Sequence, residues 1–163
     1  MRLKALVIDD SGIMRKMVMK SLTEAKLADF EFVEAVDGAD ALTKFDPQEI
    51  GIAFVDWNMP NMTGVDFVRA VRAKLRAQDY TEDMPMVMVT SEKTMAKIQE
   101  ALDEAGADAF ITKPFTTEEL ARKLKKVVDK AQLVHIRRQR EERVLQAQQQ
   151  QPASGGLFNK LFG

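Results

Sequence analysis

The sequence predicts an α/β fold built on a doubly wound, five-stranded parallel sheet. Short apolar runs alternate five times with segments whose apolar residues recur at helical spacing. Three of these runs, residues 5–8, 52–55 and 86–89, are continuous over four residues, which is typical of strands buried on both faces by helices on either side of the sheet. Crossovers in such sheets are nearly always right-handed, and ligands bind beyond the carboxyl ends of the strands.

The first two strand–helix pairs are expected before residue 50. Residues 5–8 form a continuous apolar run, which ends before a Ser-Gly pair at residues 11–12. Within residues 14–25, apolar residues then recur at helical spacing. Residues 32–36 are the second expected strand. An Asp-Gly turn follows it, and a short helix over residues 41–45 ends before Pro47.

The third and fourth pairs follow the same pattern. Residues 52–55 are the third expected strand, and Gly64 opens the next helix after a polar loop. Residues 86–89 are the fourth expected strand. The helix over residues 94–105 stops at Gly106, because glycine is common just after a helix C-terminus.

The fifth pair closes the pattern. Residues 109–111 are the last expected strand, and Thr117 is expected to cap the helix that follows. The apolar face of this helix runs from Leu120 to Ala131, so its inner side is expected to pack on the sheet.

Polar side chains follow four of these strands at the point where each ends. They are Asp9 and Asp10 after the first strand, Asp56 after the third, Thr90 and Ser91 after the fourth, and Lys113 after the fifth. Carboxyl ends of parallel strands share one edge of the sheet, so we expect these groups to converge on one crevice.

Three clustered carboxylates repel one another and need a cation. Mg²⁺ suits them because it prefers oxygen ligands, and no histidine or cysteine cluster offers a transition-metal site. A carboxylate held in this way can attack phosphorus, and Lys113 can neutralise the transferred charge. Taken singly, each residue has a plainer explanation, since a strand-terminal Asp or Thr often caps a helix and a lone lysine is usually solvated.

The composition of the chain limits the class of protein and the kinds of site that it can contain. The chain has 163 residues, 45% hydrophobic and 30% charged, which is ordinary for one globular domain with a tail. A net charge of -1 gives no general attraction to nucleic acid, and the absence of cysteine excludes disulfides and thiolate sites. No apolar run approaches the ~20 residues of a membrane span, and we expect no signal peptide, because the first apolar run stops at Asp9 and Asp10. We therefore expect a cytoplasmic location.

Four motifs together resemble the receiver domain of bacterial response regulators. They are residues 7–11 (Val-Ile-Asp-Asp-Ser), residues 55–60 with Gly64, Thr90-Ser91, and residues 113–115 (Lys-Pro-Phe). The resemblance covers residues 1–131 and is strongest to the stand-alone chemotaxis type. It implies a flavodoxin-like sheet with strand order 2-1-3-4-5 and a phosphoacceptor regulator of a two-component system. Catalysis would be limited to the regulator's own autophosphorylation and autodephosphorylation.

The resemblance also implies roles for the strand-end residues. Asp56 would accept the phosphoryl group from a histidine kinase or from a small donor such as acetyl phosphate. Asp10 and Asp56 would bind Mg²⁺ together with the backbone carbonyl of Asn58, and Asp9 would act through a metal-bound water. Thr90 and Lys113 would contact the phosphoryl oxygens. The Lys113–Pro114 peptide bond would be cis.

Signalling is expected to run through Thr90 and Phe110. The resemblance places Phe110 at the aromatic switch position, where it turns inward as Thr90 moves; the alternative is a plain core aromatic. The responding surface would be formed by the fourth helix, fifth strand and fifth helix, and it would bind a downstream protein. Asn58 and Glu92 lie where the family tunes the access of water to the phosphoryl group.

Residues 132–151 lie beyond the resemblance and are charged, then glutamine-rich. We expect them to extend the last helix and fray, with a coiled-coil dimer as the alternative. His135, the single histidine, is expected to be a solvated helix residue. This tail is too short for a DNA-binding domain, so output through protein partners is favoured over nucleic acid.

Residues 152–163 begin with a Pro-Ala-Ser-Gly-Gly linker. Four apolar residues at four-residue spacing follow it, namely Leu157, Phe158, Leu161 and Phe162. This pattern favours a docking motif that lays an apolar stripe into a partner's groove. A disordered end and a membrane-surface helix are the alternatives.

Two other classes of function remain open from the residues alone. A phosphatase of the haloacid dehalogenase type also uses a strand-end Asp with Mg²⁺, but it usually carries a second Asp where this chain has Asn58. A degenerate receiver could act purely as a binding module. The complete set of acidic, hydroxyl and lysine groups argues against that second alternative.

Overall fold

Strands and helices alternate along the chain, beginning with a strand, in the computed structural model, which describes residues 2–80 and 84–150. Their bounds, in chain order, are β1 Leu3–Ile8, α1 Gly12–Ala25, β2 Phe30–Ala35, α2 Gly38–Lys44, β3 Ile52–Val55, α3 Gly64–Ala77, β4 Met86–Thr90, α4 Met95–Gln99, the π-helical segment η1 Glu100–Glu104, β5 Ala109–Thr112 and α5 Thr117–Gln149.

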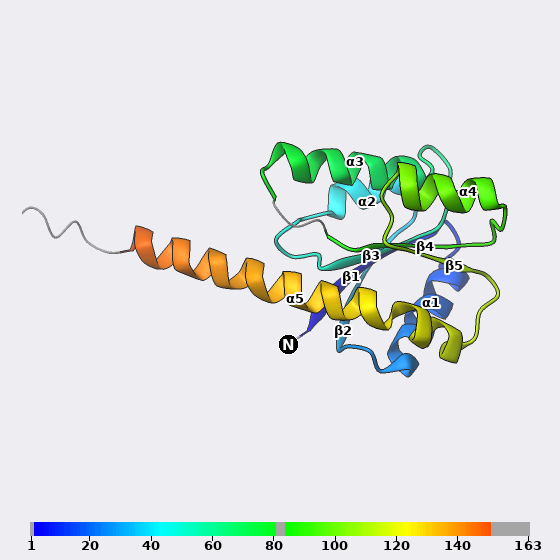
Figure 1. Ribbon diagram of the computed structural model, residues 1–163, viewed down its shortest axis with the longest axis horizontal. Helices are drawn as coiled ribbons and strands as arrows, with labels where there is room; N and C mark the ends of the chain where they lie inside the picture. Colours follow the sequence, from blue (N-terminus) through cyan, green and yellow to red (C-terminus); the bar gives the residue numbers. More distant parts are fainter. Residues whose placement is uncertain (1, 81–83, 151–163) are drawn as a thin grey trace, which may run out of the picture.

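The five strands form one parallel sheet with the order β2-β1-β3-β4-β5. Helices α2, α3 and α4 cover one face of the sheet, and α1 and α5 cover the other (Figure 1). The order reverses between β1 and β3, which places the crevice for a ligand at the carboxyl ends of these two strands. The predicted doubly wound α/β fold and its strand order are confirmed.

Successive residues of the central strands point to opposite faces of the sheet and contribute to two separate hydrophobic cores. In β3, Ala53 and Val55 belong to the core under α2 and α3. Ile52 and Phe54 belong to the core under α1 and α5. All four residues of β3 are buried, as expected for a strand covered on both faces.

Polar residues cap each helix that follows a strand. The side chains of Ser11, Asp37, Thr63 and Thr94 accept hydrogen bonds from backbone N–H groups in the first turns of α1 to α4. The expected cap of the last helix was wrong by one position. Thr116, not Thr117, is the N-cap, and it forms a reciprocal capping box with Glu119 that satisfies two otherwise unpaired N–H groups.

The helix expected over residues 94–105 is not uniform. An α-helix ends at Gln99 and a π-helical segment continues to Glu104, where Ala105 N–H donates to the Glu100 carbonyl at 2.8 Å. Gly106 then turns the chain with φ +86°, a conformation that favours glycine. A single wider turn hardly changes the periodicity of the sequence, so the pattern does not reveal it.

The last helix continues as one element well past residue 131 and leaves the body of the domain (Figure 1). The expectation that His135 is solvated was wrong, because its side chain is buried with only 6% exposed. Val134 beside it is equally buried, and Arg138 one turn later donates to the Pro47 carbonyl at 2.9 Å. Helical spacing keeps these residues on the side of α5 that faces the domain.

The C-terminal segment with Leu157, Phe158, Leu161 and Phe162 lies outside the described residues. Within residues 2–80 and 84–150, no helix combines the length and the apolar character that crossing a membrane requires.

Candidate functional site

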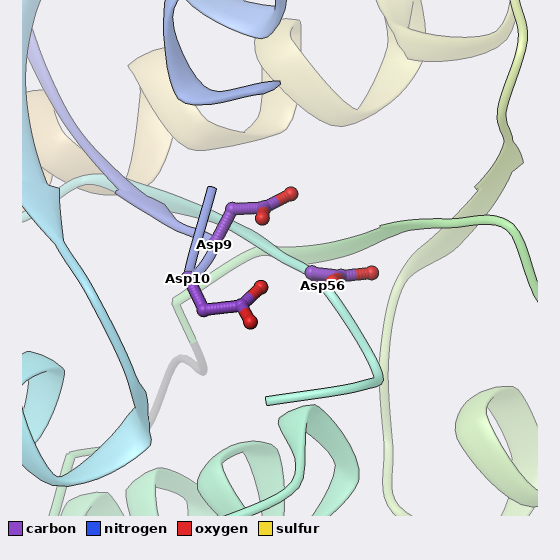
Figure 2. A group of neighbouring side chains, drawn as sticks. All are labelled: Asp9, Asp10 and Asp56. Atoms are coloured by element: carbon purple, nitrogen blue, oxygen red, sulfur yellow. The ribbon is translucent and has the colours of Figure 1, made fainter. Parts of the chain in front are cut away.

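Three carboxylates meet where the central strands end. Asp9 and Asp10 follow β1 and Asp56 follows β3, and these strands are neighbours in the sheet. Each of the three side chains has an oxygen atom within 4.8 Å of an oxygen of the others, and Figure 2 shows them directed to the same side. Asp9 and Asp56 are 4% and 8% exposed, whereas Asp10 is exposed to solvent. The site therefore has a buried inner part and an open mouth.

Lys113 brings the positive charge to this cluster from the end of β5. Its Nζ lies 2.7 Å from Asp9 Oδ2 and 3.7 Å from Asp56 Oδ1. The backbone of Lys113 is held by a hydrogen bond from its N–H to the Thr90 carbonyl at 2.8 Å. The Lys113–Pro114 peptide bond is cis, as expected.

The charge balance leaves Asp56 in an unfavourable environment. Burial raises the pKa of the Asp56 carboxyl above its ordinary value, and the negative charge of Asp9 raises it further. The Lys113 ammonium and hydrogen bonds from Thr90 and the Trp57 N–H oppose this shift without cancelling it. A divalent cation would relieve the same repulsion.

Thr90 lies at the end of β4 and is fully buried. Its hydroxyl lies close enough to the Asp56 carboxylate to lower the pKa of that group. Its Oγ also accepts a hydrogen bond from the Glu92 N–H at 3.3 Å. Thr90 therefore contacts both the central carboxylate and the loop that leads into α4.

The loop after β3 is built around the backbone of Asp56. The Asp56 N–H donates to the Ile8 carbonyl at 2.9 Å, and its Oδ1 accepts from the Trp57 N–H at 2.9 Å. Gly64 packs directly on this loop, because a Cβ at that position would collide with the Asp56 carbonyl oxygen. The close approach requires glycine at the start of α3.

The rim of the site connects two loops through side chains. Asn58 Nδ2 donates to Glu92 Oε1 at 3.0 Å, and Lys97 Nζ lies 3.0 Å from the same oxygen. Hydrogen bonds from Asn58 and then Lys97 lower the pKa of Glu92 below its ordinary value. Lys97 Nζ also lies 5.1 Å from the centroid of the Trp57 ring.

Sequence reasoning missed two residues of this region. Lys97 belongs to no recognised motif, and nothing in its local sequence indicates that it reaches Trp57, forty positions earlier. Arg15 on α1 donates from Nη1 to the Asp9 carbonyl at 2.7 Å and pairs with Glu34 at 2.7 Å. Both contacts join residues that are far apart in the sequence, so no spacing pattern predicts them.

Phe110 lies on β5 beside Met88 of β4. Its side chain is half-buried and packs against the core under α2, α3 and α4. The residue is therefore neither fixed in the deep interior nor free on the surface.

The donor set fits Mg²⁺. Asp9, Asp10 and Asp56 offer only oxygen ligands, and one of the three carboxylates is open to solvent, so a bound cation could keep several waters. Lys113 balances one of the three negative charges, which leaves a net negative site for a small divalent cation.

The protein-family model described as "Response regulator receiver domain" matches residues 5–125 of this chain. A "Chemotaxis protein CheY homolog" of Campylobacter jejuni is 40% identical over 129 residues, which are 77% of this chain and 92% of that protein. A "Chemotaxis protein CheY" of Pseudomonas aeruginosa is 36% identical over 128 residues, covering 78% of this chain and 98% of that protein.

The fold is shared with solved structures. The chemotaxis protein CheY4 of Vibrio cholerae matches with a TM-score of 0.65 and 34% identity, over 78% of this chain and 99% of that chain. A response regulator receiver domain protein of Clostridium thermocellum matches with a TM-score of 0.66 at 22% identity, over 81% of this chain and 98% of that chain, which shows the fold alone.

Proposed function

The chain belongs to the response regulator receiver domain family, and from that premise we propose that Asp56 accepts a phosphoryl group. The protein is a chemotaxis-like two-component response regulator. We propose that a change of shape after phosphorylation is its signal. The observation that best supports this proposal is the position of Asp56, which is buried near Asp9 and Lys113 at the carboxyl end of the central strand β3.

In the transfer, an oxygen of Asp56 forms a bond to phosphorus while the bond from phosphorus to the donor's leaving atom breaks. The donor is the phosphohistidine of a kinase or a small acyl phosphate. The N–H of Trp57 holds the Asp56 carboxylate in place at 2.9 Å, and Gly64 fixes the loop behind it. Positioning is most of what phosphoryl transfer requires of a protein.

Charge neutralisation is the other requirement. Asp10, Asp56 and the backbone carbonyl of Asn58 would hold Mg²⁺, with Asp9 acting through a bound water, and the cation would offset the charge on the transferred group. Lys113 would contact a phosphoryl oxygen, because its Nζ lies 3.7 Å from Asp56 Oδ1. The hydroxyl of Thr90 would donate to another phosphoryl oxygen.

The added group carries roughly −1.5 to −2 charges, which draw Thr90 and Lys113 toward it. Movement of Thr90 would open space into which the half-buried ring of Phe110 turns. We propose that this remodels the surface formed by α4, β5 and α5, where a downstream protein binds. The histidine kinase is the upstream partner.

The remainder of the chain would serve this receiver, which we assign to residues 1–131. Residues 132–151 are proposed as a helical extension. Residues 152–163 are proposed as a linker and docking segment in which Leu157, Phe158, Leu161 and Phe162 contact a partner.

Fluorescence of Trp57, the single tryptophan, tests the central proposal. We expect the emission to change on addition of Mg²⁺ and to change again on addition of beryllofluoride, a stable mimic of the phosphoryl group. The Asp56→Asn variant should lose the second response. Acetyl phosphate should add one phosphoryl group to the intact mass of the wild-type protein and none to the variant.

Two results would contradict the proposal. Phosphorylation that persists in the Asp56→Asn variant would place the acceptor elsewhere. Steady turnover of a generic phosphomonoester such as p-nitrophenyl phosphate would identify the protein as a phosphatase instead.

A further inference from the structure

Glu92 joins three parts of the rim of the site. Its backbone N–H donates to Thr90 Oγ at 3.3 Å. Its Oε1 accepts from Asn58 Nδ2 at 3.0 Å and lies 3.0 Å from Lys97 Nζ. The residue is thus fastened both through its backbone and through its side chain, so it cannot move with Thr90 while these side-chain contacts persist.

Lys97 closes this set of contacts into a ring. Its ammonium pairs with Glu92 and lies 5.1 Å from the centroid of the ring of Trp57, a residue that is only 7% exposed. Trp57 directly follows Asp56, and Asn58, the next residue, donates to Glu92. The ring therefore runs from Trp57 through Lys97 and Glu92 to Asn58, and back along the backbone to Trp57.

Lys97 is the one member of this ring that lies on α4. The other members belong to the loops that follow β3 and β4. A cation on a helix that faces both an aromatic ring and a carboxylate fixes the helix relative to both loops. Its side chain is 38% exposed, so its contacts are weak enough to break during signalling.

We propose that Lys97 is a positioning residue that holds the loop after β4, and with it the start of α4, in the unphosphorylated arrangement. The proposal rests on the function assigned to Asp56. Thr90 approaches a phosphoryl group only if Glu92 follows it or releases it, and Lys97 opposes both movements. Loss of Lys97 therefore favours the activated arrangement.

The test compares three variants. Lys97→Met keeps the length of the side chain and removes its charge. Lys97→Arg keeps the charge, the pairing with Glu92 and the stacking on Trp57. Lys93→Met is the matched control, because Lys93 is exposed, carries the same charge, and has no ion pair or ring contact within the described part of the chain.

The first measurement uses the proteins without any phosphoryl donor. We expect Lys97→Met to increase acrylamide quenching of Trp57 and to shift the backbone amide signals of Thr90 and Glu92 in NMR spectra. Lys93→Met and Lys97→Arg should leave both close to wild type. Unchanged amide signals in Lys97→Met would overturn the positioning role, whether or not Asp56 is the phosphoacceptor.

The second measurement titrates beryllofluoride at saturating Mg²⁺ and follows the amide signal of Phe110. We expect Lys97→Met to reach half-saturation at a concentration about three- to tenfold lower than wild type, since a tenfold change corresponds to about 1.4 kcal/mol. The other two variants should stay within about twofold. Equal half-saturation in Lys97→Met and wild type would show that Lys97 only covers the tryptophan, and the proposal would be wrong.

Failure of the wild-type protein to respond to beryllofluoride would contradict the function proposed for Asp56. In that case the amide shifts measured without donor still decide whether Lys97 positions the loop, so the two failures are distinguishable.

Discussion

Burial of Asp56 beside Asp9 makes its negative charge unfavourable in the absence of a bound cation. The raised pKa of Asp56 means that the folded protein disfavours the charged carboxylate more than the unfolded chain does. The folded state binds a proton more tightly than the unfolded state does, so stability is lost as pH rises through the folded pKa. At neutral pH the molecule therefore holds a destabilising charge that its proposed chemistry requires.

The Asp56→Asn substitution should raise the stability of the protein at pH 7 without Mg²⁺. The amide removes a charge that burial makes unfavourable, and we expect a gain on the order of 1 kcal/mol, within the usual range for single substitutions. Urea unfolding measures it, with the exposed Asp103→Asn as the surface control, expected within about 0.5 kcal/mol of wild type. The gain should shrink when Mg²⁺ is added to both proteins. A less stable Asp56→Asn variant without Mg²⁺ would contradict this account.

Gly64→Ala should damage both stability and the response to beryllofluoride. The new Cβ would collide with the Asp56 carbonyl, which is backbone and cannot rotate away. We expect a loss of about 1–3 kcal/mol in the free energy of unfolding, as for other overpacked sites. Gly12→Ala is the matched control, because its Cβ would meet only the end of the flexible Arg15 side chain at 3.4 Å. Equal stability of the two variants would show that the loop after β3 can move away from the added Cβ at little cost in free energy.

At the scale of elements, α5 combines two environments in one helix. Up to His135 its inner face is buried against the domain, and from Arg140 onward nearly all its residues are exposed. Arg138 lies between these two parts, where it bonds the Pro47 carbonyl and lies 5.0 Å from the Tyr80 ring centroid. The last buried contacts of the helix therefore depend on a histidine and an arginine.

His135 should titrate below its ordinary pKa. Burial lowers its pKa first, and the charge of Arg138 lowers it further. A histidine whose folded pKa is lowered contributes stability above the unfolded value of about 6.5, and that stability is lost as pH falls toward the folded pKa.

The single histidine makes this measurement direct, because its ring signals in a proton NMR titration need no separate assignment. The urea-unfolded protein provides the reference. A folded midpoint at or above the unfolded one would contradict the buried environment.

At the scale of the whole molecule, the acidic site and the C-terminal part of α5 lie at opposite ends of the sheet (Figure 1). The site occupies the carboxyl ends of β1 and β3, whereas His135 packs near Gly51 just before β3 begins. Signals at the site and contacts of the extended helix therefore involve separate surfaces of one domain.

This separation predicts how truncation acts. A chain that ends at Gln139 should keep the beryllofluoride response and unfold at nearly the wild-type urea midpoint, because residues 140–150 are almost entirely exposed. A chain that ends at Leu133 loses the buried Val134 and His135, and we expect it to be less stable by about 2–3 kcal/mol. Loss of the response in the longer truncation product would show that the exposed part of α5 takes part in the switch.

The local pattern of the sequence determined the five strand–helix pairs and the edge of the sheet where Asp9, Asp10, Asp56, Thr90 and Lys113 gather. Both follow from periodicity and chain order, since parallel strands that alternate with helices must end on the same side. Helix caps were predictable to within one residue, as Thr116 shows, because capping depends on a few neighbouring positions.

Only the tertiary structure decided the burial of His135, the wider turn at Glu100–Glu104 and the contact of Lys97 with Trp57. Each depends on which distant segments pack together and at what distance. Periodicity specifies the face of an element on which a residue lies, but not the residue that it meets on the next element. The acidic site was predictable because its members share one sheet edge, whereas the contacts that control it join separate loops.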